Sequence, residues 1–327
     1  SRLTAGDSAT LSRSPQSEVY ALIESDLQAA ISALPLEKST NGRATSLTAH
    51  ALLGKVYLYQ DKFDEAASIL EPLIGLYSLP ADPQSTFLKG GENGPESVYE
   101  IQHTKESNWW DWGYVPQGTE GNFGVIHHGI RGYSGPLYSS GWSFNVPTQN
   151  LVDAYATGDK RKDVAVLDIE EWATSTGAKY STGYEHTGYF NNKYIPRAGE
   201  SQAQQELNYE TNYRAIRYAD VLLMAAEANN RASSPNVSKA QNYLNQVRAR
   251  AYGNSSNASS STGTTLTQEI WDERRLELAG EGSRFFDLVR TGQAASVISG
   301  FVAGKHELFP IPQTEIDVSN LTQNPGY

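Results

Sequence analysis

The chain has 327 residues, of which 39% are hydrophobic and 19% charged, so it can bury a large core. Its 26 basic and 37 acidic residues give a net charge of −11, which argues against nucleic acid as a partner because phosphates would be repelled. Cysteine is absent and no run approaches 18 apolar residues, which excludes disulfides, thiolate metal sites and membrane-spanning helices.

Residues 12–75 are predicted to form helical repeats. Apolar side chains recur at helical spacing from Val19 to Leu34, and Pro35 ends this first helix. Gly54 and Ala66 follow, twelve positions apart. That spacing is typical of a tetratricopeptide-like helix pair, in which two helices approach closely only where both carry a small residue.

Residues 76–212 differ in kind, because they are rich in glycine, asparagine, serine and aromatic residues and show few helical stripes. Residues 98–103 alternate like a strand, and residues 148–155 can form one short helix. Five of the six tryptophans fall in this region. We predict an irregular, loop-rich segment that faces a ligand.

Residues 213–292 are predicted to hold the second set of repeat helices, beginning with a helical pair over about 213–251. Alanine-rich stripes around Ala226 and Ala240 carry the prediction. Residues 253–265 are rich in serine, threonine, asparagine and glycine and are expected to form an exposed, flexible loop. In residues 300–327, Pro310 and Pro312 prevent a helix, so an extended segment and a final turn are expected.

The segment 270–290 combines closely spaced apolar residues with charges of both signs around a Gly-Glu-Gly break. Apolar density of this kind predicts burial, and buried charges must pair. We expect Glu281, Arg284 and Asp287 to be buried and to pair with Arg274, Arg275 or Arg290. The whole predicted structural ion network comprises Arg274, Arg275, Glu277, Glu281, Arg284, Asp287 and Arg290.

The same segment closely resembles the ERR-x-ELA-x-EG-x-R-x-FDL-x-R stretch of the SusD/RagB family. Other parts of the chain are also similar to that family, namely residues 147–162, the repeat helices near residues 216–228 and 244–251, and the ending over residues 308–327. The resemblance covers residues 12–327. It implies one mainly α domain with a tetratricopeptide-like helical repeat core and a loop-rich, aromatic-rich insertion. By this resemblance the chain lacks the family's N-terminal part.

For function, the resemblance implies a non-enzymatic protein that binds oligosaccharides or polysaccharides at the extracellular face of the outer membrane. It would deliver them to a SusC-like TonB-dependent transporter as its partner. A lipid anchor, absent from this chain, would be the only membrane attachment. The resemblance assigns no ligand residue, because the sites of family members vary in position.

Ligand residues are therefore predicted from chemistry. A pyranose ring stacks its axial C–H bonds on an aromatic face, while amide and carboxylate groups bind its hydroxyls. Trp109, Trp110 and Trp112 lie within four residues, too densely for a single loop to bury all three. Glycan contacts are predicted for Asn108, Trp109, Trp110, Asp111, Trp112, Tyr133, Tyr138 and Trp142.

Three other interpretations concern a metal site, an enzyme and a protein-binding scaffold. His127 and His128 suggest a metal, but adjacent side chains point apart and no third ligand lies at chelating spacing, so no metal and no cofactor are expected. A glycoside hydrolase would need two carboxylates about 5–10 Å apart, which sequence cannot exclude. A peptide-binding or protein-binding helical-repeat scaffold fits the helices equally well, but it has no need of a tryptophan-rich insertion.

Overall fold

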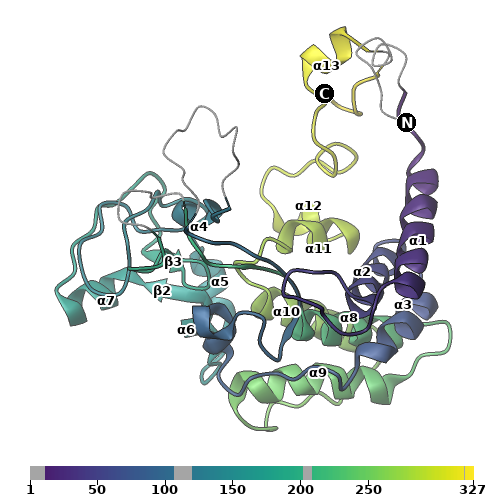
Figure 1. Ribbon diagram of the computed structural model, residues 1–327, viewed down its shortest axis with the longest axis horizontal. Helices are drawn as coiled ribbons and strands as arrows, with labels where there is room; N and C mark the ends of the chain where they lie inside the picture. Colours follow the sequence, from purple (N-terminus) through teal and green to yellow (C-terminus); the bar gives the residue numbers. More distant parts are fainter. Residues whose placement is uncertain (1–11, 107–119, 202–207, 320) are drawn as a thin grey trace.

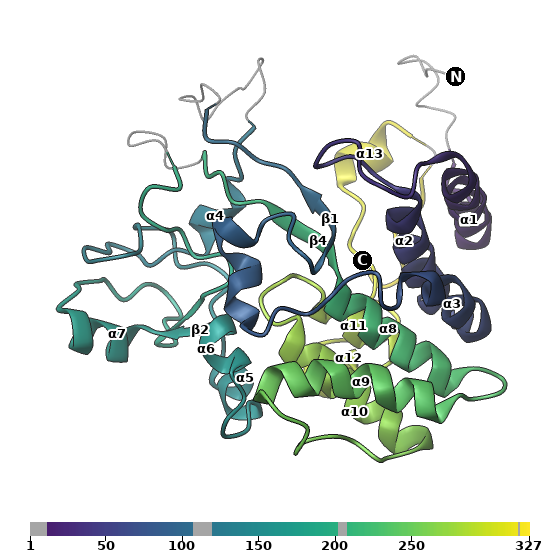
Figure 2. The same ribbon diagram turned by 60° about the horizontal axis from the view of Figure 1, so that its bottom comes forward.

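Helices form most of the regular backbone in the computed structural model, which describes residues 12–106, 120–201, 208–319 and 321–327. Packed repeat helices form one part of the molecule, and a loop-rich part lies beside them (Figures 1 and 2). This arrangement confirms the predicted mainly α fold with a loop-rich insertion. In the described parts of the chain, no helix has both the length and the apolar character needed to cross a membrane.

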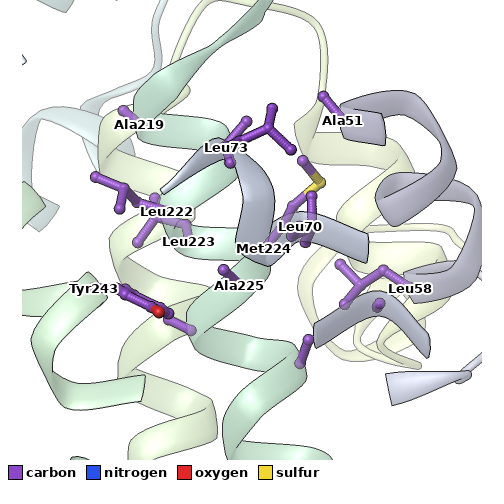
Figure 3. Packing of buried hydrophobic residues seen from close by; sticks show 14 of the residues in the cluster. Ala51, Leu58, Leu70, Leu73, Ala219, Leu222, Leu223, Met224, Ala225 and Tyr243 are labelled. Atoms are coloured by element: carbon purple, nitrogen blue, oxygen red, sulfur yellow. The ribbon is translucent and has the colours of Figure 1, made fainter. Parts of the chain in front are cut away.

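The core lies around α8, whose residues from Tyr218 to Asn230 are all buried. Figure 3 shows Leu70 of α3, Leu222 and Leu223 of α8 and Tyr243 of α9 as members of one apolar cluster. Long apolar stripes on neighbouring helices explain this packing, because one stripe is removed from water when it packs against the stripe of another helix. The repeat helices are α1 (Gln16–Ala33), α2 (Ser46–Leu58), α3 (Phe63–Leu70), α8 (Tyr218–Arg231), α9 (Val237–Tyr252) and α10 (Gly263–Glu277).

Close contact between α2 and α3 depends on Gly54. A Cβ at this position would lie 2.4 Å from a methyl carbon of Leu70, and Ala66 of α3 is fully buried. The sequence spacing of Gly54 and Ala66 therefore marks the point where the two helices approach. By contrast, α1 buries none of its residues completely, although Leu27 and Ile31 pack against the core cluster.

The pair of strands β1 (Ser97–Ile101) and β4 (Tyr213–Arg217) joins the loop-rich region to the helices. The strands are antiparallel, with Ile101 opposite Tyr213. Strand β4 corrects the prediction that a helix begins near residue 213, since α8 starts only at Tyr218. The physical reason is that β1 offers an unpaired edge, and extended backbone lets Arg214 donate to the carbonyl of Thr86 while Arg217 donates to the carboxylate of Glu96.

Within the loop-rich region, short elements surround a second apolar cluster that includes Ile130, Ile169 and Phe190. Strands β2 (Val166–Asp168) and β3 (Tyr189–Asn191) pair antiparallel. The helices of this region are α4 (Gly124–His127), α5 (Gln149–Ala154), α6 (Arg161–Ala165) and α7 (Ile169–Thr176). Among the described residues, the 3-10 segments Glu71–Leu73, Pro83–Phe87 and Lys89–Gly91 precede β1.

The C-terminal part carries α11 (Arg284–Arg290) and α12 (Ala294–Val297) and then an irregular segment. Backbone after Pro310 is non-helical as far as Pro312, which is the N-cap of a short helix, α13 (Gln313–Asp317). The prediction of an extended segment was therefore wrong for these five residues. Arg13 donates a hydrogen bond to the side chain of Asn324, which ties the two ends of the described chain together.

A buried ion network centred on Glu277 links the loop-rich region to the repeat helices. The carboxylate of Glu277 forms ion pairs with three arginines. The nitrogen–oxygen distances are 2.6 Å to Arg217 and 3.2 Å to Arg161, and Arg250 is the third partner. These three arginines come from β4, α6 and α9. Burial would raise the pKa of Glu277, but the three arginines outweigh it and hold the pKa far below its ordinary value.

A second chain of ion pairs runs along α8, α10 and α11. Asp220 pairs with Arg274 at 2.7 Å, and Arg274 reaches Asp287 at 3.1 Å. Arg290 then bridges Asp287 at 2.9 Å and Glu227 at 2.8 Å. Asp220, Asp287 and Glu227 each have an arginine partner in this series of ion pairs, so the cost of burying their charges is offset.

Among the residues that the structure describes, five of the seven predicted for the ion network form ion pairs, and Arg275 and Arg284 do not. Arg274, Glu277, Glu281, Asp287 and Arg290 form ion pairs, but Glu281 pairs with Lys193 and Arg217 and not with the expected arginines. Arg275 donates to Asn150 instead of to a carboxylate. Arg284 is only half-buried, and no ion pair to it occurs within the described residues.

The expected burial and pairing of Arg284 are therefore corrected. Burial and the like charge of Arg275 both lower the pKa of Arg284, and Asp287 and Asp272, which raise it, only partly offset them. Asp287, by contrast, is buried and pairs with Arg274 and Arg290 as predicted.

We expect Gly54→Ala to destabilise the fold by about 1–3 kcal/mol, because the new methyl group must push Leu70 aside. The higher helix propensity of alanine, about 1 kcal/mol, offsets only part of this cost. Urea unfolding measures the change. Gly90→Ala is the control, because no atom lies within 4 Å of its new Cβ. Equal stability of the two variants would contradict the close approach.

Replacing Arg217 by methionine should lower the free energy of unfolding by about 3–5 kcal/mol, because Glu96, Glu277 and Glu281 would lose a shared partner while buried. The matched variant Arg284→Met should cost only about 0.5 kcal/mol. Chemical denaturation of both proteins tests the assignment. A larger loss for Arg284→Met than for Arg217→Met would overturn it.

Candidate functional site

The structure separates the predicted glycan contacts into three groups. Asn108, Trp109, Trp110, Asp111 and Trp112 lie outside the described residues. Tyr133 and Tyr138 are described and buried, and only Trp142 is half-buried at the surface.

Tyr133 and Tyr138 are corrected from ligand contacts to core residues. Their exposed fractions are 8% and 6%, and both belong to the apolar cluster of the loop-rich region. The Tyr133 hydroxyl donates to the carbonyl of Pro136 and accepts from Trp172, while the Tyr138 hydroxyl donates to Asn192. Their polar atoms are therefore used internally, and neither ring offers a face to a ligand.

Trp142 instead belongs to a cluster that we call the aromatic surface, defined by Phe123, His127, Trp142 and Phe144. The His127 ring lies in the middle, with centroid distances of 5.8 Å to Phe123, 4.9 Å to Trp142 and 5.9 Å to Phe144. Phe123 and Phe144 are 49% and 53% exposed. Large exposed rings gathered at one place are typical of a binding surface.

Close backbone contacts build the aromatic surface. Trp142 donates its backbone N–H to the carbonyl of Ile126, and Phe144 donates its N–H to the carbonyl of His127. The two segments can approach because Gly129 and Gly141 face one another: a Cβ on Gly141 would lie 2.4 Å from the Cα of Gly129. The backbone therefore positions the rings before any ligand arrives.

A pocket of about 200 Å³ contains His128 and is lined by chain neighbours of Phe123, His127 and Phe144. Burial lowers the pKa of His128 to about 4, so its ring is neutral at physiological pH. Its Nδ1 is buried without a partner, which favours the tautomer with the proton on Nε2. The ring can then donate one hydrogen bond. Other lining residues are Asn122, Asn145, Tyr194, Tyr213 and Glu281.

The far wall of this pocket is the Gly-Glu-Gly turn of residues 280–282. Gly280 and Gly282 both have positive φ, and Tyr213 donates its hydroxyl proton to the carbonyl of Glu281. Burial would raise the pKa of Glu281, but Arg217 and Lys193 outweigh burial and lower it. The backbone of the Gly-Glu-Gly turn therefore forms part of the pocket wall, while the carboxylate of Glu281 belongs to the ion network.

Sequence reasoning missed Phe123 and Phe144 and considered His127 only as a metal ligand. Two signals could have found them. Phe123 and His127 are four residues apart, which places them on one face of a helical turn. Trp142 and Phe144 are two residues apart, which places them on one face of extended backbone. Neither spacing indicates that the two segments meet.

Comparisons with known proteins agree with this fold. The model of the SusD family matches residues 168–327. A solved structure described as a laminarin binding SusD-like protein is 39% identical, with a TM-score of 0.88, covering 99% of this chain and 72% of that one. Surface glycan-binding protein A from Bacteroides thetaiotaomicron, in complex with laminarihexaose, is 28% identical with a TM-score of 0.81, covering 94% of this chain and 70% of that one.

Among curated sequences, SusD-like protein P2 of Formosa agariphila is 31% identical over 97% of this chain. The chain spans 66% of the length of that relative and 61% of the length of SusD-like protein P38 from the same organism. The chain belongs to the SusD family, which confirms the resemblance found in its sequence.

The neutral state of His128 can be measured directly. We expect its ring carbon-bound protons to titrate near pH 4 in an NMR pH series, well below the ordinary value of 6.5, because the buried ring resists charging. His128→Asn identifies the resonance by its disappearance. A midpoint near 6.5 would show that the ring is open to water and would contradict the described pocket.

Proposed function

We propose that this protein binds a neutral laminarin-type glucan at the aromatic surface, with one sugar residue entering the adjoining His128 pocket. The observation that most supports this proposal is the aromatic surface itself, in which three aromatic rings have their centroids 4.9–5.9 Å from that of His127. Aromatic faces suit a neutral sugar, because stacking needs an apolar face and hydroxyls need single donors and acceptors. Relatives whose names refer to laminarin and laminarihexaose support this ligand class.

The tryptophan-rich segment remains part of the proposal. Thr104 donates its backbone N–H to the carbonyl of Glu120, so the described residues on either side of positions 107–119 lie close together. Glu120 is only three residues before Phe123. We therefore propose that Asn108, Trp109, Trp110, Asp111 and Trp112 extend the aromatic surface.

We further propose that binding is not accompanied by hydrolysis. A glycosidase needs two carboxyl groups at the sugar, one of which must carry a raised pKa to act as the acid. Glu281 is the carboxylic residue lining the described His128 pocket, and its arginine and lysine partners lower its pKa. A carboxyl group held ionised in this way makes a poor proton donor.

Binding without hydrolysis suits a protein that transfers an intact glycan to another protein. We propose that the bound glycan is delivered to a SusC-like TonB-dependent transporter, and that the full-length protein acts at the extracellular face of the outer membrane through a lipid anchor. Membership of the SusD family supports this partner and this location. Co-purification of the full-length protein with a transporter from outer membranes tests the pairing.

Trp142→Ala and Phe144→Ala should each weaken laminarihexaose affinity about fivefold, because one stacked ring contributes on the order of 1 kcal/mol. Affinity is measured by isothermal titration calorimetry or by NMR titration, beside thermal stability. Phe309→Ala is the matched control, since that ring is 75% exposed but lies on the C-terminal segment. Its replacement should leave affinity unchanged.

Two outcomes would refute the proposal. Unchanged affinity in the Trp142→Ala/Phe144→Ala double variant would place the glycan elsewhere. Consumption of laminarihexaose by the wild-type protein during incubation would make the protein an enzyme. Loss of affinity with unchanged thermal stability would support binding at the aromatic surface.

A further inference from the structure

We propose a second sugar-binding pocket, located between α6, α7 and the β2–β3 pair, which takes one residue of a neutral oligosaccharide. We call it the Trp172 pocket. Its cavity of about 280 Å³ is comparable to the smaller ligand pockets of proteins and has room for a single sugar. It shares no lining residue with the His128 pocket. Helix α7 lies at the outer end of the loop-rich region, away from the repeat helices (Figures 1 and 2).

Trp172 gives this pocket an apolar wall. Its indole N–H donates to the hydroxyl of Tyr133, and its ring packs edgewise against Tyr138 at a centroid distance of 5.2 Å. Because the polar edge of the half-buried ring is used inside the protein, the part that lines the cavity is carbon. Tyr189 also lines the cavity, and its hydroxyl donates to Gln149. These are the surfaces on which the C–H face of a sugar stacks.

Carboxylates with unused hydrogen-bonding capacity lie on the rim. Asp168 caps α7, and a single oxygen, Oδ1, accepts from the N–H groups of Glu170 and Glu171, so Oδ2 remains available. The exposed side chains of Asp163 and Glu171 also line the pocket. No hydrogen bond or ion pair within the described residues engages either carboxylate. Carboxylates accept the hydrogen bonds that sugar hydroxyls donate, and such charge-assisted bonds are the stronger kind.

The charge of the rim restricts the ligand. Asp163, Asp168 and Glu171 oppose one ammonium group, that of Lys162. Uronic acids and sulfated sugars would be repelled, whereas neutral sugars would not. A cation is the competing ligand, but no group of three or more potential ligands in the described chain is arranged to hold a metal ion. A neutral sugar therefore fits both the wall and the rim.

The ligand class is that of the proposed function, but the site is separate, so the two can fail independently. In the Trp142→Ala/Phe144→Ala double variant, the aromatic surface is removed. Laminarihexaose added to the double variant should still shift the indole N–H resonance of Trp172 in NMR spectra. Absence of any shift of that resonance, in both the wild-type protein and the double variant, would overturn the Trp172 pocket while leaving the aromatic surface untouched.

Blocking the pocket provides the matched comparison. Ser175 is exposed and lines the cavity, so Ser175→Trp should fill it and weaken the residual binding at least tenfold. Thr174→Trp adds the same ring at a neighbouring exposed position that does not line the cavity, and it should leave binding unchanged. Equal binding by the two variants would refute the pocket. Should Ser175→Trp fail to fold, as judged by circular dichroism, the milder Asp163→Asn/Glu171→Gln variant should still weaken binding several-fold.

Two further probes test the chemistry. A glucuronic acid oligosaccharide should leave the Trp172 resonance in place, because the rim is acidic, and a shift as large as that with laminarihexaose would contradict the charge argument. Calcium chloride is the second probe. A calcium-induced shift without any response to laminarihexaose would make this a cation site and overturn the sugar assignment.

Discussion

The arrangement of the whole molecule depends on how one buried carboxylate, that of Glu277, is neutralised. Burying an isolated charge would cost many kcal/mol, so the acid is tolerable only with its arginines in place. Those arginines come from three separate segments, and Lys193 adds a bond to the backbone carbonyl of the same residue. Pairing at this one point therefore determines where the loop-rich region sits on the repeat helices.

The geometry of the candidate site depends on the same buried ion network. Arg217 and Lys193 hold Glu281, and the turn that carries Glu281 forms the far wall of the His128 pocket. On the other side, the backbone contact at Gly129 and Gly141 holds the rings of the aromatic surface. A surface organised in advance loses little conformational entropy on binding, which compensates for the small energy of each stacking contact.

Sequence patterns predicted the parts of this structure that are local or repeated. The spacing of Gly54 and Ala66 predicted the α2–α3 contact, and the segment from Ile270 to Arg290 was sufficient to recognise the family. Patterns failed where distant segments meet. Tyr133 and Tyr138 lie in a loop with the composition of a ligand site, yet their hydroxyls bind Pro136 and Asn192 internally. Glu281 pairs with Lys193, 88 residues away, and nothing in the adjacent sequence indicates this.

The same network bears on how the chain reaches its folded state. Glu277 lies 60 residues beyond Arg217 and 116 beyond Arg161. Until α10 has been synthesised, these arginines have no acid at the centre of the network, so the loop-rich region cannot close over them. Long-range pairing of this kind slows folding and makes it cooperative. We therefore expect the loop-rich and helical parts to fold as one unit, because an isolated piece comprising residues 76–212 would carry Arg161 and Lys193 without most of their counter-charges.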